Sequence, residues 1–153
     1  MLFLVLMKAD VLQRSLILRY AGEYKSLSVL RLSGALMEAD RETSDARGKG
    51  EVTFSESGDV NLSYREAESG VTVSLKKEGD RLEIRRAGAE LVFLRGEATS
   101  FLYRTAYGTL PTEAITEEIS LIKKEHSALL TLVYTAVLGG MAQKNEMRFK
   151  ITY

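Results

Sequence analysis

From Leu27 onward, apolar and polar residues alternate with a period of two along most of the chain. Turn-forming residues interrupt this alternation roughly every 8 to 12 positions, and apolar stripes with the period of a helix are scarce. This combination is typical of all-β sandwiches and barrels. We therefore predict an all-β protein.

The pattern predicts about ten strands in series. The clearest hairpin signal is the tight reversal at Gly79-Asp80, between VTVSL and RLEIRR. A charged stretch, RETSD, is interpreted as the loop after the first strand. The predicted strands are Leu27–Asp40, Gly50–Glu56, Val60–Glu66, Val71–Leu75, Arg81–Arg86, Glu90–Leu94, Thr99–Leu110, Glu113–Lys123, Ala128–Leu138 and Met147–Tyr153.

Residues 1 to about 25 do not share this alternation. We predict a short helix from about Asp10 to Tyr20, with Asp10 as its N-cap and Gly22 as its stop. The apolar residues of this segment fit neither the helical period nor the strand period cleanly. They are Val11, Leu12, Leu16, Leu18 and Tyr20.

A long series of antiparallel strands leaves unpaired edges unless the sheet closes on itself. We therefore predict a single closed or nearly closed antiparallel up-and-down barrel of about 8–10 strands. Residues 26–153 form the barrel domain in this interpretation, and residues 1–25 form a short N-terminal helix or extension. Barrels of this size hold packed side chains or one small ligand.

Several short motifs in the second half of the chain resemble the uncharacterised YwiB-like family (DUF1934). They are LEIRRAG, FLRG, YRTAYGTL and AITEEI. The resemblance rests on their order and spacing, and it extends back to about residue 26. The resemblance implies a calycin-like (lipocalin-like) β-barrel. It implies no activity, and binding of a small apolar molecule follows only by analogy with calycins as a class.

The charge and composition narrow the function classes. The 21 Lys and Arg residues balance the 21 Asp and Glu residues, so we expect no nucleic-acid partner. The chain contains no cysteine, which favours the cytoplasm as the location. The apolar start, MLFLVLM, is shorter than the roughly 20 residues that a membrane-spanning helix needs, so we expect no membrane span.

The sequence offers little for catalysis. Its one histidine, His126, lies in a predicted surface turn, and Gly48-Lys49-Gly50 is too short for a phosphate-binding loop. No spacing typical of a metal site occurs. We therefore expect no catalytic residue, no metal and no cofactor, and an enzyme is the less favoured hypothesis.

The stretch TSFLYRTAYGTL, residues 99–110, has two candidate inward faces. We predict that the face of Phe101, Tyr103, Thr105 and Tyr107 points into the barrel, and the face of Leu102, Ala106 and Leu110 is the alternative. Aromatic side chains on an inward face line a ligand pocket only if the interior has room.

Two arginines and one carboxylate complete the candidate site. Arg86 continues the apolar face of RLEIRR, and Arg104 lies on the Leu102 face. Each can close a barrel end or bind the acidic head of an amphipathic ligand. In AITEEISLIKK, we expect either Glu117 or Glu118 to point inward and to pair with an arginine.

Two functions follow from these features. The first is a non-catalytic module that binds a small apolar or amphipathic ligand in the barrel. The alternative is a structural or protein-interaction module with a filled core. Residues 128–138 are apolar on both faces, so their outer face needs cover by residues 1–20 or by a second subunit in a homodimer. The predicted ligand-binding residues are Arg86, Phe101, Tyr103, Arg104, Thr105, Tyr107 and Glu117.

Overall fold

The structure is a computed structural model that describes residues 5–32, 37–106 and 108–153. Its strands and one short helix follow one another along the chain, and no helix of the described residues has the length and apolarity to cross a membrane. The elements are β1 (Met7–Tyr20), α1 (Leu27–Leu32), β2 (Glu38–Phe54), β3 (Val60–Glu66), β4 (Thr72–Glu78), β5 (Arg81–Arg86), β6 (Ala89–Leu94), β7 (Ala98–Thr105), β8 (Gly108–Lys123), β9 (Ser127–Leu138) and β10 (Met141–Thr152).

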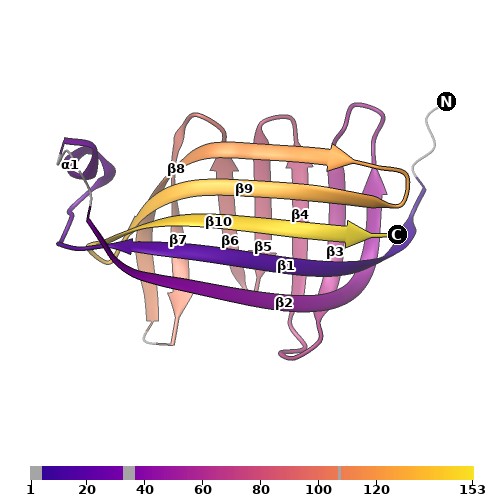
Figure 1. Cartoon of the computed structure of the whole chain (residues 1–153), viewed down its shortest axis with the longest axis horizontal. Helices are drawn as coiled ribbons and strands as arrows, with labels where there is room; N and C mark the ends of the chain where they lie inside the picture. The colour runs from indigo at the N-terminus through magenta and orange to yellow at the C-terminus, as the bar shows by residue number, and fades with distance from the viewer. Residues whose placement is uncertain (1–4, 33–36, 107) are drawn as a thin grey trace.

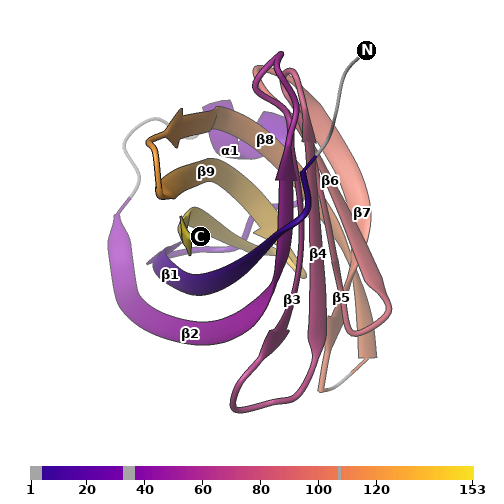
Figure 2. The same cartoon turned by 90° about the vertical axis from the view of Figure 1, so that its right-hand side faces the viewer.

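The strands of the described residues form one ten-stranded antiparallel sheet in the order β6-β5-β4-β3-β2-β1-β10-β9-β8-β7. Figure 1 shows that β8, β9, β10, β1 and β2 cross the front of the molecule, while β3 to β7 run nearly perpendicular to them behind. The same two layers are visible from the side in Figure 2. The sheet therefore folds over on itself, and its two layers pack nearly at right angles. The predicted nearly closed antiparallel barrel is confirmed.

Two glycines allow β2 to approach β3 closely at the corner between the layers. A Cβ atom on Gly50 would lie 1.9 Å from the backbone oxygen of Ser63, and one on Gly48 would lie 2.4 Å from the backbone oxygen of Arg65. Neither position tolerates a side chain without movement of the β3 backbone. β2 therefore passes from the front layer to the back layer at this point (Figure 2).

The core lies between the layers and is filled by alternate residues of the strands. β3 shows the alternation most clearly, because every second residue of VNLSYRE is buried. Burial of large apolar side chains from both layers is the main stabilising contribution. The largest fully buried side chains include Phe93, Phe149, Leu62, Leu75, Leu82, Leu130, Leu132, Ile151 and Val52.

The barrel closes incompletely at the joint between β6 and β7. These strands occupy the two ends of the sheet, and no ladder pairs them among the described residues. Near the turn that connects them, Arg95 forms an isolated bridge with Thr116, and the amide of Gly96 donates to the carbonyl of Thr116 at 2.8 Å. Backbone hydrogen bonding thus holds the turn between β6 and β7 against β8.

The helix predicted over Asp10–Tyr20 is wrong, because this segment is the strand β1. Hydrogen-bonded ladders with β2 and β10 hold it on both sides. These tertiary partners outweigh the weak local preference of the sequence. Residues 7–20, assigned above to an extension, thus supply a central strand of the barrel sheet.

The first strand predicted at Leu27–Asp40 is wrong over Leu27–Leu32 and right at its end, where Glu38–Asp40 begin β2. Leu27–Leu32 forms the short helix near the N-terminus, and its first turn is capped by Ser26, whose Oγ accepts from the amide of Val29 at 3.4 Å. Residues 33–36 lie outside the described residues.

The charged stretch RETSD is not a loop but part of β2. Its neighbourhood is stabilised across strands by Arg19 of β1, which binds Asp40 at 3.1 Å and Glu42 at 2.7 Å. This half of β2 is exposed on both faces, so the apolar alternation that marks other strands is missing.

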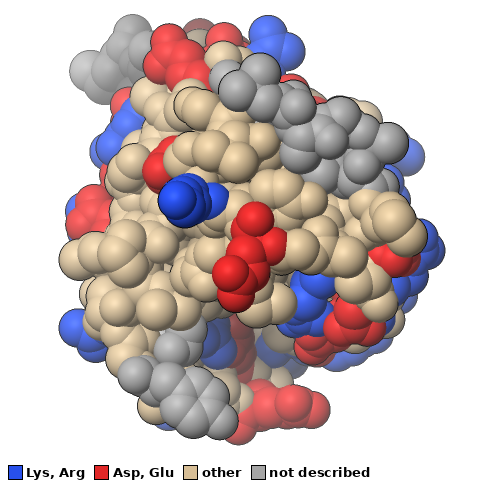
Figure 3. Space-filling view, turned by 90° about the vertical axis from the view of Figure 1, so that its left-hand side faces the viewer, with Lys and Arg blue, Asp and Glu red and all other residues tan. Residues whose placement is uncertain are grey.

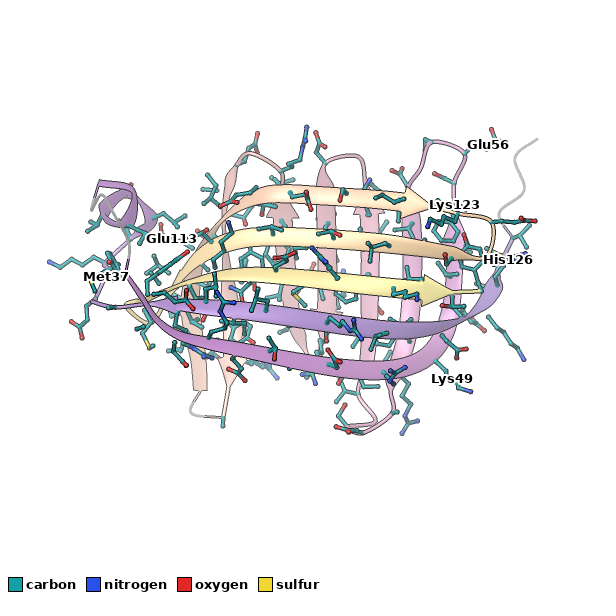
Figure 4. All side chains as sticks on the ribbon, in the orientation of Figure 1. Met37, Lys49, Glu56, Glu113, Lys123 and His126 are labelled. Atoms are coloured by element: carbon teal, nitrogen blue, oxygen red, sulfur yellow. The ribbon has the colours of Figure 1, made fainter. Side chains whose placement is uncertain are left out.

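Helix α1 covers part of the outer face of β9. Leu27 and Leu30 pack against Val137 and Ala142, and the carboxylate of Glu113 accepts from the amide of Leu27 at 3.4 Å (Figure 4). Figure 3 shows the surface at this end of the molecule as largely uncharged. Helix α1 therefore covers β9 at this end, and Tyr20 of β1 packs against the same cluster.

Candidate binding site at the mouth of the barrel

Arg86 lies at the end of an inward face, as predicted from RLEIRR. The preceding residues of that face, Leu82 and Ile84, are buried in the core. Glu66 ends the inward face of β3 in the same way, and the two side chains meet across the start of β4. Arg86 donates from Nε to Oε2 of Glu66 at 3.0 Å and from Nη2 to Oε1 at 2.7 Å, which is a bidentate ion pair.

The ion pair holds Glu66 in its charged form. Arg86 lowers the pKa of the Glu66 carboxyl, outweighing burial, which raises it, and a hydrogen bond of 2.6 Å from the Ser69 hydroxyl lowers it further. The same contact raises the pKa of Arg86. Arg86 and Glu66 therefore form a neutral but strongly polar pair at this end of the interior.

Tyr64 and Tyr103 lie beside Arg86, and Tyr134 is the next tyrosine beyond Tyr103. Tyr64 precedes Glu66 on the inward face of β3, and Tyr134 faces inward from β9; burial raises the pKa of both phenols well above the ordinary value. Tyr103 lies near enough to Arg86 and Tyr134 to raise the pKa of each electrostatically. Because Tyr103 is 39% exposed, the cluster reaches solvent. We call Tyr64, Glu66, Arg86, Tyr103 and Tyr134 the mouth cluster.

An aromatic wall continues from the mouth cluster into the core. The ring of Phe93 lies 4.6 Å from that of Tyr134 and 5.4 Å from that of Phe101. Phe101 packs against the core while Leu102 is 62% exposed, so the Phe101 face of β7 points inward, as predicted. The side chain of Thr105 and the whole of Tyr107 lie outside the described part of the chain, so their predicted roles stay predictions.

A row of buried polar residues crosses the front layer beside the mouth cluster. Thr116 of β8 pairs with Tyr134 of β9, which pairs with Asn145 of β10. Thr116 Oγ1 and Asn145 Nδ2 are buried and have no hydrogen-bond partner among the described residues, although Gln143 donates to Asn145 Oδ1 at 3.3 Å. Buried polar atoms in native proteins are usually paired with protein or water. These two atoms therefore offer free hydrogen-bonding capacity inside the barrel.

Glu117 does not belong to the site. The ladder between β8 and β9 has a bulge between Thr116 and Glu118, and this bulge reverses the alternation of β8. Both Glu117 and Glu118 are consequently exposed, so the predicted inward carboxylate is wrong. Glu117 instead binds Lys144 at 3.3 Å and accepts from the hydroxyl of Thr135 at 3.3 Å on the outer face.

Arg104 is also separate from the mouth cluster. It lines an outer groove of about 440 Å³ at the joint of β6 and β7, together with Leu102 and Phe101. A Cβ atom on Gly88 would lie 3.0 Å from Nη1 of Arg104, so the guanidinium rests over the turn between β5 and β6. The structure therefore brings Arg86, Phe101 and Tyr103 together and leaves Arg104 and Glu117 outside.

Sequence reasoning missed Glu66, Tyr64, Tyr134, Thr116 and Asn145. The alternation of VNLSYRE carried a usable signal, because it continues without a break from Tyr64 to Glu66. The pairing of Thr116, Tyr134 and Asn145 depends on strand register and has no local signal. His126, in contrast, lies in an exposed turn as predicted, where its nearest carboxylate is Glu125 at 3.7 Å.

The mouth cluster places polar groups beside aromatic side chains. It offers tyrosine hydroxyls and a guanidinium next to an aromatic wall, and the polar row adds the hydroxyl of Thr116 and the amide of Asn145. Among the described residues, no group of three or more histidine, aspartate or glutamate side chains could hold a metal ion.

These features define an all-β protein, a nearly closed ten-stranded antiparallel barrel whose interior is polar at one end. The family profile described as "Domain of unknown function (DUF1934)" matches residues 33–151, and the chain belongs to this family. The crystal structure of the ywiB protein from Bacillus subtilis has the same fold, with a TM-score of 0.63 and 18% sequence identity over 94% of this chain and 91% of that chain. No curated protein matches this chain.

Replacing Arg86 with glutamine is expected to lower the free energy of unfolding by about 1–3 kcal/mol at neutral pH, because buried Glu66 loses its charged partner. The pKa of Glu66 is lower in the folded protein than its ordinary value of 4.5. The stability that the pair contributes is therefore complete above about pH 4.5 and is lost as the pH falls through the folded pKa. Urea unfolding between pH 3 and pH 7 measures this difference.

Arg14→Gln is the control, since Arg14 forms only an exposed pair with Asp45 at 3.7 Å. We expect it to cost less than about 1 kcal/mol at any pH. A stability difference between Arg86→Gln and the wild type that stays constant from pH 7 to pH 3 would contradict a stabilising role for the charged pair.

Proposed function

We propose that this protein is a non-catalytic binding module that holds a small amphipathic molecule at the mouth of the barrel. The observation that carries the proposal is the pair of buried, unpartnered polar atoms, Thr116 Oγ1 and Asn145 Nδ2, on either side of Tyr134. A polar ligand atom at this position would satisfy hydrogen-bonding groups that the protein leaves free.

The polar groups favour an oxygen-rich head group. The amide Nδ2 of Asn145 donates only, and the raised pKa of Tyr134 keeps its hydroxyl protonated and able to donate. Glu66 already neutralises Arg86. A neutral acceptor, such as a ketone or ester carbonyl, is therefore favoured over a free carboxylate, whose burial would lack a matching charge.

The apolar part of the ligand is limited to the wall formed by Phe93 and Phe101. Further inside, Phe149, Leu130 and Leu132 are fully buried and fill the space between the layers. We therefore propose a short ligand that occupies one end of the barrel rather than its whole length.

The alternative, a partner or a second copy bound to residues 128–138, has less support. Helix α1 covers Val137, and Leu129 and Val133 pair with Lys150 and Glu146 of β10, whose stems shield neighbouring apolar surface. Ile122, which pairs with Leu129, is 58% exposed. Because of this exposed apolar side chain, a partner contact on this face is the second hypothesis.

Ligand binding can be measured by NMR titration of the protein with methyl octanoate, octanoate and octane. We expect chemical-shift changes at Tyr103 and Tyr134, largest for the ester. Tyr134→Phe and Thr116→Val keep the side-chain shape but remove one hydroxyl, and each should weaken ester binding about 5-fold, the value of one neutral hydrogen bond. Tyr20→Phe, on the outer surface, is the matched control and should leave the affinity unchanged.

Native mass spectrometry of freshly purified protein adds an independent measurement, because a tightly held ligand would appear as additional mass. The proposal fails if no additional mass is found and none of the three probes shifts the mouth cluster. Equal binding by the wild type and by Tyr134→Phe would contradict the proposed role of the polar row.

A further inference from the structure

Two adjacent hollows lie on the outer surface at the corner where β2 bends. The larger measures about 750 Å³ and the smaller about 500 Å³. They share Asp10, Lys49 and Thr152 in their walls, so they form one continuous depression, which we call the corner groove. Figure 4 shows Lys49 pointing from the bend of β2 away from the barrel.

The corner groove is basic, although the whole chain has balanced charges. Its walls carry two carboxylates, Asp10 and Glu51. Against these stand five cationic side chains, which are Lys8, Arg47, Lys49, Arg65 and Lys150. The difference, five minus two, leaves a net charge of +3 on the side chains that line the two hollows.

Most of these cations have no carboxylate within ion-pair distance. Lys49 lies 4.0 Å from Asp10, at the limit for an ion pair. In the described part of the chain, no carboxylate lies within that distance of Lys8, Arg47, Arg65 or Lys150, whereas the arginines of β5 all have carboxylate partners. The corner groove thus concentrates positive charge that the protein itself does not neutralise.

Strand register arranges these groups across the sheet. Arg65 pairs with Lys49, which pairs with Asp10, and Thr72 and Thr152 flank the row at its two ends. Gly48 and Gly50 allow the bend of β2 that places this row in a depression. The groove therefore presents cations, hydroxyls and the carboxylate of Asp10 along one line of the surface, and Glu51 lies in a neighbouring row with Lys8 and Ser63.

We propose that the corner groove binds an extended acidic segment of a partner protein. The unpaired cations provide electrostatic complementarity for glutamate or aspartate side chains. Asp10 and Glu51 can accept hydrogen bonds from the backbone amides of a peptide, but they repel the evenly charged backbone of a nucleic acid. This site lies on the outer surface. Tyr64 lines the larger hollow and also belongs to the mouth cluster, but none of the five cations of the groove does.

Fluorescence anisotropy with a fluorescein-labelled peptide of alternating glutamate and glycine tests the proposal. The wild type should bind the peptide, and binding should weaken as salt rises from about 50 to 200 mM, because surface charges are screened. The double variant Arg65→Glu and Lys150→Glu should lose about 10-fold or more in affinity. The matched control, Lys77→Glu with Lys124→Glu, changes the net charge equally outside the groove and should change affinity less than about 2-fold.

A single-stranded oligonucleotide of equal net charge and inorganic phosphate serve as competing probes. Displacement of the peptide only by excess phosphate, with weak oligonucleotide binding, supports the peptide site. The proposal is overturned if the oligonucleotide binds more tightly than the peptide, if both double variants lose affinity equally, or if the wild type shows no peptide binding at low salt. Circular dichroism confirms that each variant is folded before it is compared.

Discussion

Replacing Gly50 with alanine is expected to lower the free energy of unfolding by about 3 kcal/mol or more, the upper range for an overpacked position. The added Cβ would lie 1.9 Å from the carbonyl oxygen of Ser63 and 2.5 Å from Cα of Tyr64. Both atoms belong to the backbone of β3, which pairs with β2 on one side and with β4 on the other, so neither can move without disturbing two ladders.

Urea denaturation at neutral pH measures this effect, with Gly58→Ala as the control. Gly58 has a φ of +88° and no atom near its missing Cβ. Alanine there has only the backbone cost, about 1 kcal/mol. If Gly50→Ala costs no more than Gly58→Ala, the close approach of β2 and β3 is not a requirement of the fold.

The middle of the chain was predictable because its structure is local. From Val60 to Leu94, each strand pairs with the next one across a short turn, and β3, β4 and β5 alternate clearly between buried and more exposed residues. The reversal at Gly79-Asp80 joins β4 to β5, as its turn chemistry indicated. Local sequence thus contains most of the information needed for this part of the barrel.

The first third of the chain was less predictable because its structure depends on distant partners. β1 lies between β2 and β10, and β10 is at the opposite end of the sequence. The first half of β2 is exposed on both faces, so no apolar pattern distinguishes it from a charged loop. Only pairing with β1 and the contacts of Arg19 with Asp40 and Glu42 define it as a strand.

The candidate site also has a part that local sequence predicts and a part that depends on distant contacts. Arg86 was found because it extends an apolar face by one step, and that face is local to β5. The contact between Arg86 and Glu66 spans two hairpins and was not predictable from either. Glu117 was misplaced because one bulge in β8 reverses every side chain after it, and nothing in AITEEISLIKK marks the bulge.

Replacing Val11 with aspartate is expected to destabilise the protein by about 4 kcal/mol or to prevent folding. Val11 is 3% exposed and belongs to the main core, so the variant loses apolar burial and places an unpaired carboxylate among apolar side chains. Thermal and urea unfolding measure the loss directly.

Leu12→Asp is the matched control, because the same carboxylate is introduced one residue later on the opposite face of β1. Leu12 is only half-buried, and its cross-strand partners are Arg47 and Lys150, which would attract the new charge. We expect a cost of about 1 kcal/mol. If residues 7–20 were a peripheral extension, both variants would be tolerated alike; a large difference between them is the signature of a strand with one face in the core.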